Sequence, residues 1–259
     1  MIQTMGAFPV GAASSISSVT AAEMADVDGL AVDEFGIDIL QMMEQAGSHL
    51  AELVRCELGG DLRGRRVIAA VGPGNIGGGG LAAARHLANR GASVRVILAS
   101  PVNWLSEAGR HQLATLLQMS VECCVAIWDV LDDELDRELA TADVVVDAIL
   151  GYRGSGPPHD GVLWLVERVA RASVPVISLD MPSGVDADTG EAAGAAVTAT
   201  ATLTLALPKP GLFRAVGRNR AGRIYLGDIG LPAALYRRLG LEAGIPFAEG
   251  PIVRLEADA

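Results

Sequence analysis

Residues 66–80 read Arg-Val-Ile-Ala-Ala-Val-Gly-Pro-Gly-Asn-Ile-Gly-Gly-Gly-Gly. The apolar run at 66–71 is typical of a buried parallel strand, and the glycines after it allow a backbone to approach a ligand closely. A helix is expected at 81–90, and a helix N-terminus favours negative charge. This order predicts an anion-binding turn at the end of a strand; a flexible turn without a ligand is the alternative.

The glycines at 72, 74 and 77 also match the Gly-x-Gly-x-x-Gly fingerprint of dinucleotide-binding folds. That fingerprint expects an Asp or Glu about 20 residues later, where the second strand ends, to hold the ribose hydroxyls. Here the second expected strand ends in Ile-Leu-Ala-Ser at 97–100, and the next carboxylate is Glu107. NAD-dependent hydride transfer is therefore the weaker hypothesis.

Strands and helices alternate on both sides of this segment. A capping box at Thr20 begins a helix that we expect to reach about Leu30, and a second amphipathic helix is expected at 37–58. Further strands are expected at 93–99, 121–128, 144–150, 174–179, 200–207 and 223–227, with helices at 104–118, 134–140 and 162–172. This alternation predicts one α/β domain over residues 18–259, with a mostly parallel sheet covered on both faces, after a flexible N-terminus at 1–17.

Composition narrows the class of protein. Half of the 259 residues are hydrophobic and a fifth are charged, which allows a large core. The net charge of −11 disfavours binding to nucleic acid, and no apolar run is long enough to span a bilayer. The three cysteines, at 56, 123 and 124, lack the spacing of a disulfide framework or a zinc site. We therefore expect a cytoplasmic protein that binds neither nucleic acid nor membrane.

Two further expected strands end in carboxylates. Asp147 lies inside an apolar run, where a carboxylate is costly unless it is paired or bound to a cation. Asp180 comes where its strand stops, and a partly desolvated carboxylate there could act as a general acid or base. The alternatives are a structural acid bonded to backbone amides for Asp147 and a turn-capping aspartate for Asp180.

Four motifs occur in a fixed order: GPGNIGGGG at 72–80, DAILG at 147–151, DMPSG at 180–184 and LPKPG at 207–211. Together with MEQAG at 43–47, they resemble the NAD(P)H-hydrate epimerase family, also called the YjeF N-terminal domain, over about residues 18–232. The family's four motifs read Gly-x-Gly-Asn-Asn-Gly-Gly-Asp-Gly, Asp-Ala-Leu-Phe-Gly, Asp-Ile-Pro-Ser-Gly and Leu-Pro-Lys-Pro-Gly. Four motifs in register are far more specific than any one of them.

The resemblance implies a three-layer α/β/α Rossmann-like sandwich, often a homodimer. It implies an isomerase that interconverts the R and S epimers of hydrated NADH or NADPH, so that a separate, stereospecific dehydratase can repair both. No tightly bound organic cofactor is expected.

The resemblance also assigns site residues, carried over position by position. Asp180 would contact the hydrated ring and transfer protons, and Lys209 falls on the family's lysine. Lys209 is the one lysine among twenty basic residues. The nucleotide would be bound by Asp180 and by two segments: Asn75, Ile76, Gly77, Gly78 and Gly79, and then Gly151, Tyr152, Arg153, Gly154, Ser155, Gly156 and Pro157.

Asp147 and Ser183 would help to coordinate potassium. However, Ile76 stands where the family has an asparagine that binds the ion, and Gly79 stands where it has an aspartate. An isoleucine side chain has no donor atom for a hard cation, so potassium binding is a doubtful prediction. These departures keep a second hypothesis open, namely a non-catalytic nucleotide-binding or dimerisation module with the same fold.

Overall fold

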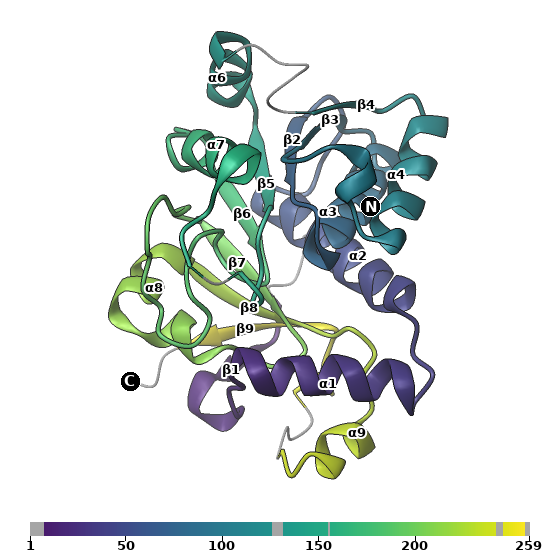
Figure 1. The fold of residues 1–259 in the computed structure, drawn as a ribbon, viewed down its shortest axis with the longest axis vertical. Coiled ribbons are helices and arrows are strands. Elements are labelled where there is room, and N and C mark those ends of the chain that lie inside the picture. Colours follow the sequence, from purple (N-terminus) through teal and green to yellow (C-terminus); the bar gives the residue numbers. More distant parts are fainter. Residues whose placement is uncertain (1–7, 126–131, 155, 242–245, 257–259) are drawn as a thin grey trace.

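The computed structural model describes residues 8–125, 132–154, 156–241 and 246–256. Within them, nine strands form one sheet in the order β1-β9-β8-β7-β6-β5-β2-β3-β4 (Figure 1). The strands are β1 (Val10–Ala12), β2 (Arg66–Val71), β3 (Ser93–Leu98), β4 (Glu122–Val125), β5 (Val144–Ala148), β6 (Val176–Leu179), β7 (Ala201–Leu205), β8 (Arg223–Gly227) and β9 (Ile252–Glu256). Neighbouring strands are parallel except β8 and β9, which confirms the predicted, mostly parallel sheet.

The direction in which strands are added reverses at β2. From β2 the chain adds β3 and β4 on one side, and it then returns to add β5, β6 and β7 on the other. The connections that leave the carboxyl ends of β2 and β5 consequently run in opposite directions. Open α/β sheets bind ligands in the crevice that forms at such a switch point.

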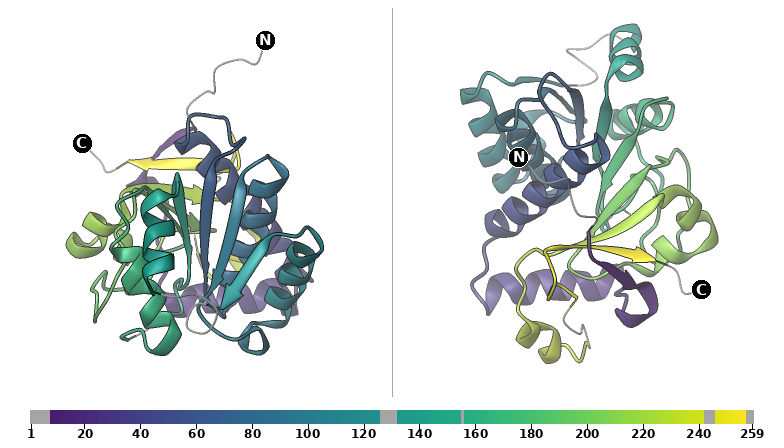
Figure 2. Two further views of the ribbon diagram at one scale, coloured as in Figure 1. Left: turned by 90° about the horizontal axis from the view of Figure 1, so that it is seen from above. Right: turned by 180° about the vertical axis from the view of Figure 1, so that it is seen from behind.

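Helices cover both faces of the sheet, as Figure 1 and Figure 2 show. They are α1 (Ala21–Asp33), α2 (Ile39–Glu57), α3 (Asn75–Asn89), α4 (Glu107–Gln118), α6 (Asp132–Thr141), α7 (Asp160–Ala170), α8 (Ala215–Ala221) and α9 (Ala233–Arg238), with short 3-10 turns η1 (Ala13–Ser15), η2 (Val102–Trp104) and η3 (Pro210–Phe213). In the described part of the chain, no helix is both long and apolar enough to cross a membrane.

Alternating side chains of β2 divide the core into two layers. Val67, Ala69 and Val71 belong to the cluster that includes the apolar side chains of α2, α3 and α4. Ile68 and Ala70 belong to the cluster beneath α6 and α7. Because a strand points successive side chains to opposite faces, this alternation gives three layers, helix on sheet on helix. The predicted three-layer α/β/α arrangement is confirmed.

The glycine-rich segment differs from its prediction as a turn. Helix α3 begins at Asn75 rather than at residue 81, so the turn is confined to residues 72–74. A Cβ atom at Gly80 would lie 2.4 Å from the Cβ of Ala148 in β5, and one at Gly77 would lie 1.9 Å from the carbonyl oxygen of Gly72. The buried glycines therefore let α3 pack closely on the sheet, a requirement for space that a sequence pattern cannot distinguish from a requirement for flexibility.

The two ends of the chain hold the other departures from expectation. Residues 10–12 form β1 and pair with β9, although no regular structure is expected there. Strand β9 lies about 240 residues away along the chain, so local periodicity gives no sign of this pairing. The Phe8 ring packs edge-on against Tyr225 of β8, with the centroids 5.5 Å apart.

The part of the expected strand 121–128 beyond Val125 lies outside the described residues.

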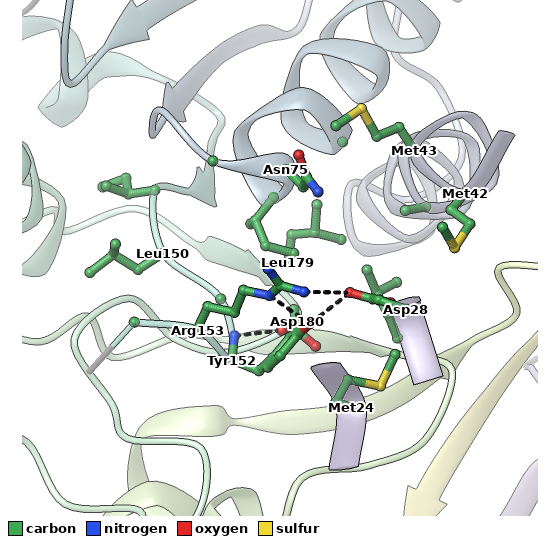
Figure 3. A pocket seen from close by; sticks show the side chains of 18 of the residues that line it. Met24, Asp28, Met42, Met43, Asn75, Leu150, Tyr152, Arg153, Leu179 and Asp180 are labelled. Atoms are coloured by element: carbon green, nitrogen blue, oxygen red, sulfur yellow. Dashed lines mark hydrogen bonds and ion pairs between the residues drawn. The ribbon is translucent and has the colours of Figure 1, made fainter. Parts of the chain in front are cut away.

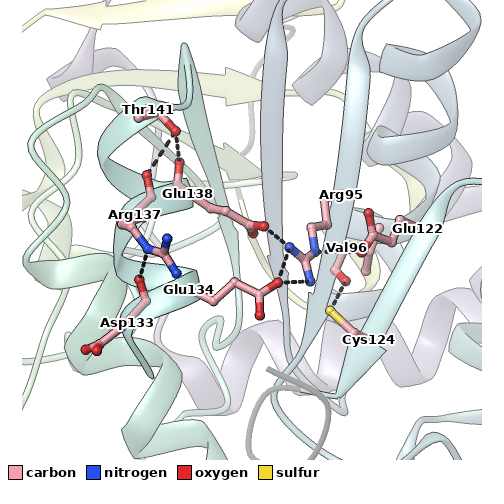
Figure 4. A network of polar contacts seen from close by, with 9 residues as sticks. All are labelled: Arg95, Val96, Glu122, Cys124, Asp133, Glu134, Arg137, Glu138 and Thr141. Atoms are coloured by element: carbon pink, nitrogen blue, oxygen red, sulfur yellow. Dashed lines mark hydrogen bonds and ion pairs between the residues drawn. The ribbon is translucent and has the colours of Figure 1, made fainter. Parts of the chain in front are cut away.

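Arg95 of β3 attaches α6 to the far edge of the sheet (Figure 4). Its guanidinium pairs with Glu138, and it lies 3.3 Å from Oε1 of Glu134, one helical turn earlier. A third carboxylate, from Glu122 of the neighbouring strand β4, lies 3.2 Å from Arg95 Nε. The side chain of Arg95 is only 16% exposed, so this network of charges is partly desolvated. Its ion pairs with Glu134 and Glu138 hold α6 against β3.

The close packing of α3 on β5 leads to a test of stability. We expect Gly80→Ala to lower the free energy of unfolding by about 1–3 kcal/mol, because the new methyl would meet the Cβ of Ala148, which cannot move without its strand. Gly78→Ala should cost less, because its nearest neighbour is the flexible end of Met43. Urea unfolding of both variants measures the difference; equal stabilities would contradict this explanation of the glycines.

Candidate functional site at the switch point

A pocket of about 410 Å³ lies at the carboxyl ends of the central strands, with α1 and α2 on its other side (Figure 3). The segments after β2, β5 and β6 contribute to it, as does Leu205 of β7. Its volume is within the range of small-molecule sites. The pocket therefore stands at the crevice that the strand order predicts.

The N-terminus of α3 forms one wall of this pocket. Gly74, Asn75, Ile76 and Gly79 line it. Gly74 is the N-cap residue and offers no side chain to the first N–H groups of the helix. These backbone donors are thus left for a ligand, and an anionic group is the one that a helix N-terminus favours.

Asp180 and Lys209 form a buried ion pair in the pocket. Lys209 Nζ donates to Asp180 Oδ1 at 2.6 Å and to the carbonyl oxygen of Leu205 at 2.9 Å. Asp180 Oδ2 accepts a second hydrogen bond, at 2.8 Å, from the backbone N–H of Tyr152. Both charged side chains are 1% exposed. Asp180 and Lys209 were both predicted as site residues from the sequence. They are 29 positions apart in the chain, and the fold brings them into direct contact.

The backbone at Asp180 explains how the carboxylate reaches this place. Asp180 has φ = +69°, and the N–H of Met181 donates to the carbonyl oxygen of Leu179, so β6 ends in a tight three-residue turn. Ala206 has φ = +62° in a corresponding turn at the end of β7. Aspartate tolerates this left-handed region better than most residues, and strained backbone of this kind is concentrated at functional sites.

Tyr152 links Asp180 to a second carboxylate, Asp28 of α1. The phenol of Tyr152 donates to Asp28 Oδ2 at 2.6 Å, and Arg153 Nε donates to the same phenol at 2.8 Å. Arg153 also lies 3.7 Å from Asp28 Oδ2. Burial raises the pKa of Asp28, against the hydrogen bond from Tyr152 and the positive charges of Lys209 and Arg153.

Asp147 and Ser183 lie behind the pocket, completely buried. Ser183 Oγ donates to Asp147 Oδ1 at 2.5 Å, and Ser183 N and Ser178 Oγ donate to Oδ2 at 2.9 and 2.7 Å. Burial raises the pKa of Asp147, opposed by these hydrogen bonds. Ser183 Oγ also accepts from Leu150 N at 2.9 Å. These hydrogen bonds connect the 180–184 turn to the end of β5. They support the alternative in which Asp147 is a structural acid.

The predicted nucleotide-binding residues are distributed unevenly around the pocket. Gly151, Tyr152, Arg153 and Gly154 line it beside the residues of α3 already described. Others do not line it: Gly77 and Gly78 face the segments that pack against α3, Gly156 borders a smaller neighbouring hollow, and Pro157 lines neither. Ser155 lies outside the described residues. Gly79 faces the pocket, with Leu179 Cδ2 2.9 Å from the position of a Cβ atom.

The wall of the pocket that α1 and α2 form contains no residue that was predicted as a site residue. It consists of Met24 and Asp28 of α1 together with Ile39, Met42, Met43 and Ala46 of α2. From a single sequence, methionines at helical spacing that line a pocket cannot be distinguished from methionines that pack in the hydrophobic core. The MEQAG resemblance at 43–47 was the one signal that pointed to α2, and nothing singled out Asp28.

An open, mostly parallel sheet with a pocket at its switch point places the protein in the Rossmann-like class of α/β domains. The family model of the YjeF-related protein N-terminus matches residues 39–211. The chain therefore belongs to the YjeF N-terminal family.

Individual relatives agree with this assignment. The chain is 41% identical to a Dehalogenimonas lykanthroporepellens NAD(P)H-hydrate epimerase, over 96% of this chain and 97% of that protein. It is 36% identical to a Moorella thermoacetica bifunctional NAD(P)H-hydrate repair enzyme over 84% of this chain, but spans only 41% of that longer protein. The crystal structure of yeast ynu0, YNL200c, superposes with a TM-score of 0.79 at 25% identity, covering 93% of this chain and 100% of the yeast chain.

The buried bonds of Asp147 allow a paired test of stability. We expect Ser183→Ala to lower the free energy of unfolding by about 1–3 kcal/mol, because it removes a donor from Asp147 and leaves the Leu150 N–H without its acceptor. Ser178→Ala removes a donor from Asp147 alone and should cost less. Thermal and urea unfolding compare the two; a Ser178→Ala variant that is the less stable of the two would contradict this role for Ser183.

Proposed function

We propose that this protein is an isomerase that interconverts the R and S epimers of hydrated NADH and NADPH, and so contributes to nicotinamide nucleotide repair. The observation that carries the proposal is the 41% identity to an NAD(P)H-hydrate epimerase over nearly the whole of both chains. The pocket supplies a chemical reason, since the buried Asp180–Lys209 pair and the N-terminus of α3 line the same cavity.

The reaction requires little from the protein. The ring nitrogen expels the hydroxyl at C6, and water returns to C6 from the other face. A carboxyl group that exchanges protons with the departing and entering oxygens accelerates both halves. Asp180 is held for this task by Lys209 Nζ and by the N–H of Tyr152. The lysine also balances the buried negative charge.

The nucleotide would occupy the two glycine-lined walls of the pocket. The N–H groups at the start of α3, which have no side-chain cap, suit its phosphates, and the apolar residues of α2, including Met42 and Met43, suit a ring. The Ile76 side chain packs against Gly151, where a Cβ atom would lie 2.3 Å from Ile76 Cγ1. This contact holds the two walls together without a polar side chain at position 76.

Potassium does not fit the residues of this chain well. Asp147 already accepts hydrogen bonds on both oxygens, and the side chain of Ile76 has no oxygen to offer. Among the described residues no group of three or more histidine, cysteine or acidic side chains could hold a metal ion. The proposed reaction therefore contains no step that uses potassium.

Broader expectations accompany this proposal. No disulfide joins Cys56, Cys123 and Cys124, which is consistent with the proposed reducing, cytoplasmic compartment. A stereospecific dehydratase is the functional partner that would consume the product, and a homodimer is the assembly that the family resemblance suggests.

Asp180→Asn tests the proposed activity. A dehydratase specific for one epimer consumes that fraction of hydrated NADH quickly and then waits for slow spontaneous epimerisation. Wild-type protein should abolish the slow phase. Asp180→Asn should lower the rate of catalysed epimerisation about 10²- to 10⁴-fold, because the amide cannot transfer the proton. Asparagine also tolerates a positive φ, so the turn at the end of β6 should survive.

A matched control is Asp160→Asn, which changes another aspartate of positive φ that lies outside the pocket and is exposed. It should leave the activity unchanged. If wild-type protein binds nucleotide in calorimetry but leaves the slow phase untouched, the non-catalytic binding module is the correct function.

Exchange of monovalent cations provides a separate test. We expect activity and thermal stability to be similar in potassium, sodium and choline salts at equal ionic strength, because Ile76 and the saturated Asp147 leave few ligands for the ion. A large effect specific to potassium would show that the turns around Asp147 bind the ion after all.

A further inference from the structure

The pocket contains a second carboxylic acid that the proposed reaction has not used. Asp28 reaches into it from α1, while Asp180 enters from the end of β6 (Figure 3). Tyr152 touches both carboxyl groups, through its backbone N–H for Asp180 and its phenol for Asp28. The two acids are thus held about one tyrosine side chain apart, in a pocket whose helical wall is otherwise apolar.

The surroundings of the two acids differ in kind. Asp180 accepts from an ammonium group and a backbone N–H, one on each oxygen. Asp28 receives its hydrogen bond on Oδ2 alone, and within the described residues no hydrogen bond reaches Oδ1. The Asp28 side chain is 18% exposed, so Oδ1 is available to a ligand or to water.

We propose that Asp28 and Asp180 form an acid–base pair in which Asp28 is the second catalytic residue of the epimerase reaction. This inference rests on the proposed function and deepens it. In one direction, protonated Asp28 gives its proton to the leaving hydroxyl while the C6–O bond breaks and the ring nitrogen forms a double bond to C6. Water then attacks C6, the double-bond pair returns to nitrogen, and Asp180 accepts the proton of that water.

Exchange of protons with solvent returns both carboxyl groups to their starting state. Each turnover moves one proton from Asp28 to Asp180, and exchange with water in the pocket restores both groups. In the reverse direction the two acids exchange roles. Tyr152 is a positioning residue here, because its phenol and its backbone N–H fix the separation of the two carboxyl groups.

The charges around Asp28 agree with the role of an acid. Burial is the largest influence and raises its pKa, as does the negative charge of Asp180. The hydrogen bond from Tyr152 and the charges of Lys209 and Arg153 oppose this rise. Tyr236 of α9 also lies near Asp28: burial raises the pKa of its phenol, as do the negative charges of Asp228 and Asp28. A raised pKa keeps the carboxyl protonated to higher pH, and the acid is lost as the pH rises through that pKa.

The test measures epimerisation against pH for wild-type protein, Asp28→Asn, Asp28→Glu and Asp26→Asn, with calorimetry of NADP binding for each. Asp28→Asn should lose about 10²- to 10⁴-fold in rate while it still binds the nucleotide, and the alkaline limb of the pH–rate profile should disappear. Asp28→Glu should keep that limb and regain part of the rate. Asp26, on the exposed face of the same helix, is the matched control and should behave as wild type.

An Asp28→Asn variant with wild-type rate, or with an unchanged alkaline limb, would overturn this inference and leave the proposed function intact. A wild-type protein without activity would overturn the proposed function, and this inference with it. A carbon-13 titration of the aspartate carboxyl groups gives a readout that does not depend on activity. It should show a resonance of raised pKa that is missing in Asp28→Asn, and its absence from wild type would also overturn the inference.

Discussion

The contact between Lys209 and Asp180 is the interaction on which the site depends. Both side chains are almost completely buried, so neither charge has water to stabilise it, and each is tolerable because the other lies 2.6 Å away. The lysine also binds the last carbonyl of β7, while the aspartate binds the loop that follows β5. One ion pair therefore ties three strand ends together and directs a carboxylate into the pocket. Loss of either partner would leave an unpaired charge at the centre of the switch point.

A second constraint is the space between α3 and the sheet. The glycines of α3 bring its N-terminus against the ends of β2 and β5, where the strand order reverses. The helix dipole and the N–H groups at the start of α3, which the N-cap residue Gly74 does not cap with a side chain, then face the same pocket as the ion pair. The proposed anion site and the proposed proton-transfer group thus lie side by side because of two separate features of packing. Ile76 contributes to this packing through its contact with Gly151 and places no polar side chain there.

Local patterns in the sequence were enough for the central strands, the capped helix α1 and the polar residues at strand ends. The strand at 66–71 agrees with β2 residue for residue, because a buried parallel strand is read from its own composition. The motifs also indicated Asp180 and Lys209. Asp28, Met42 and the β1–β9 pairing could not be predicted, because each depends on contacts between distant segments. The helical state of Asn75–Gly80 was missed because glycine lowers helix propensity while the tight packing that requires it is invisible in sequence.

The proposed reaction requires this pocket to hold the nicotinamide end of the nucleotide beside Asp180. A crystal structure of the protein soaked with NADP measures this directly. We predict that the phosphates lie at the N-terminus of α3 and that the nicotinamide ring lies within hydrogen-bonding reach of Asp180, with Asp28 also facing it. A nucleotide bound away from this pocket, or bound in it with the adenine at Asp180, would contradict the claim.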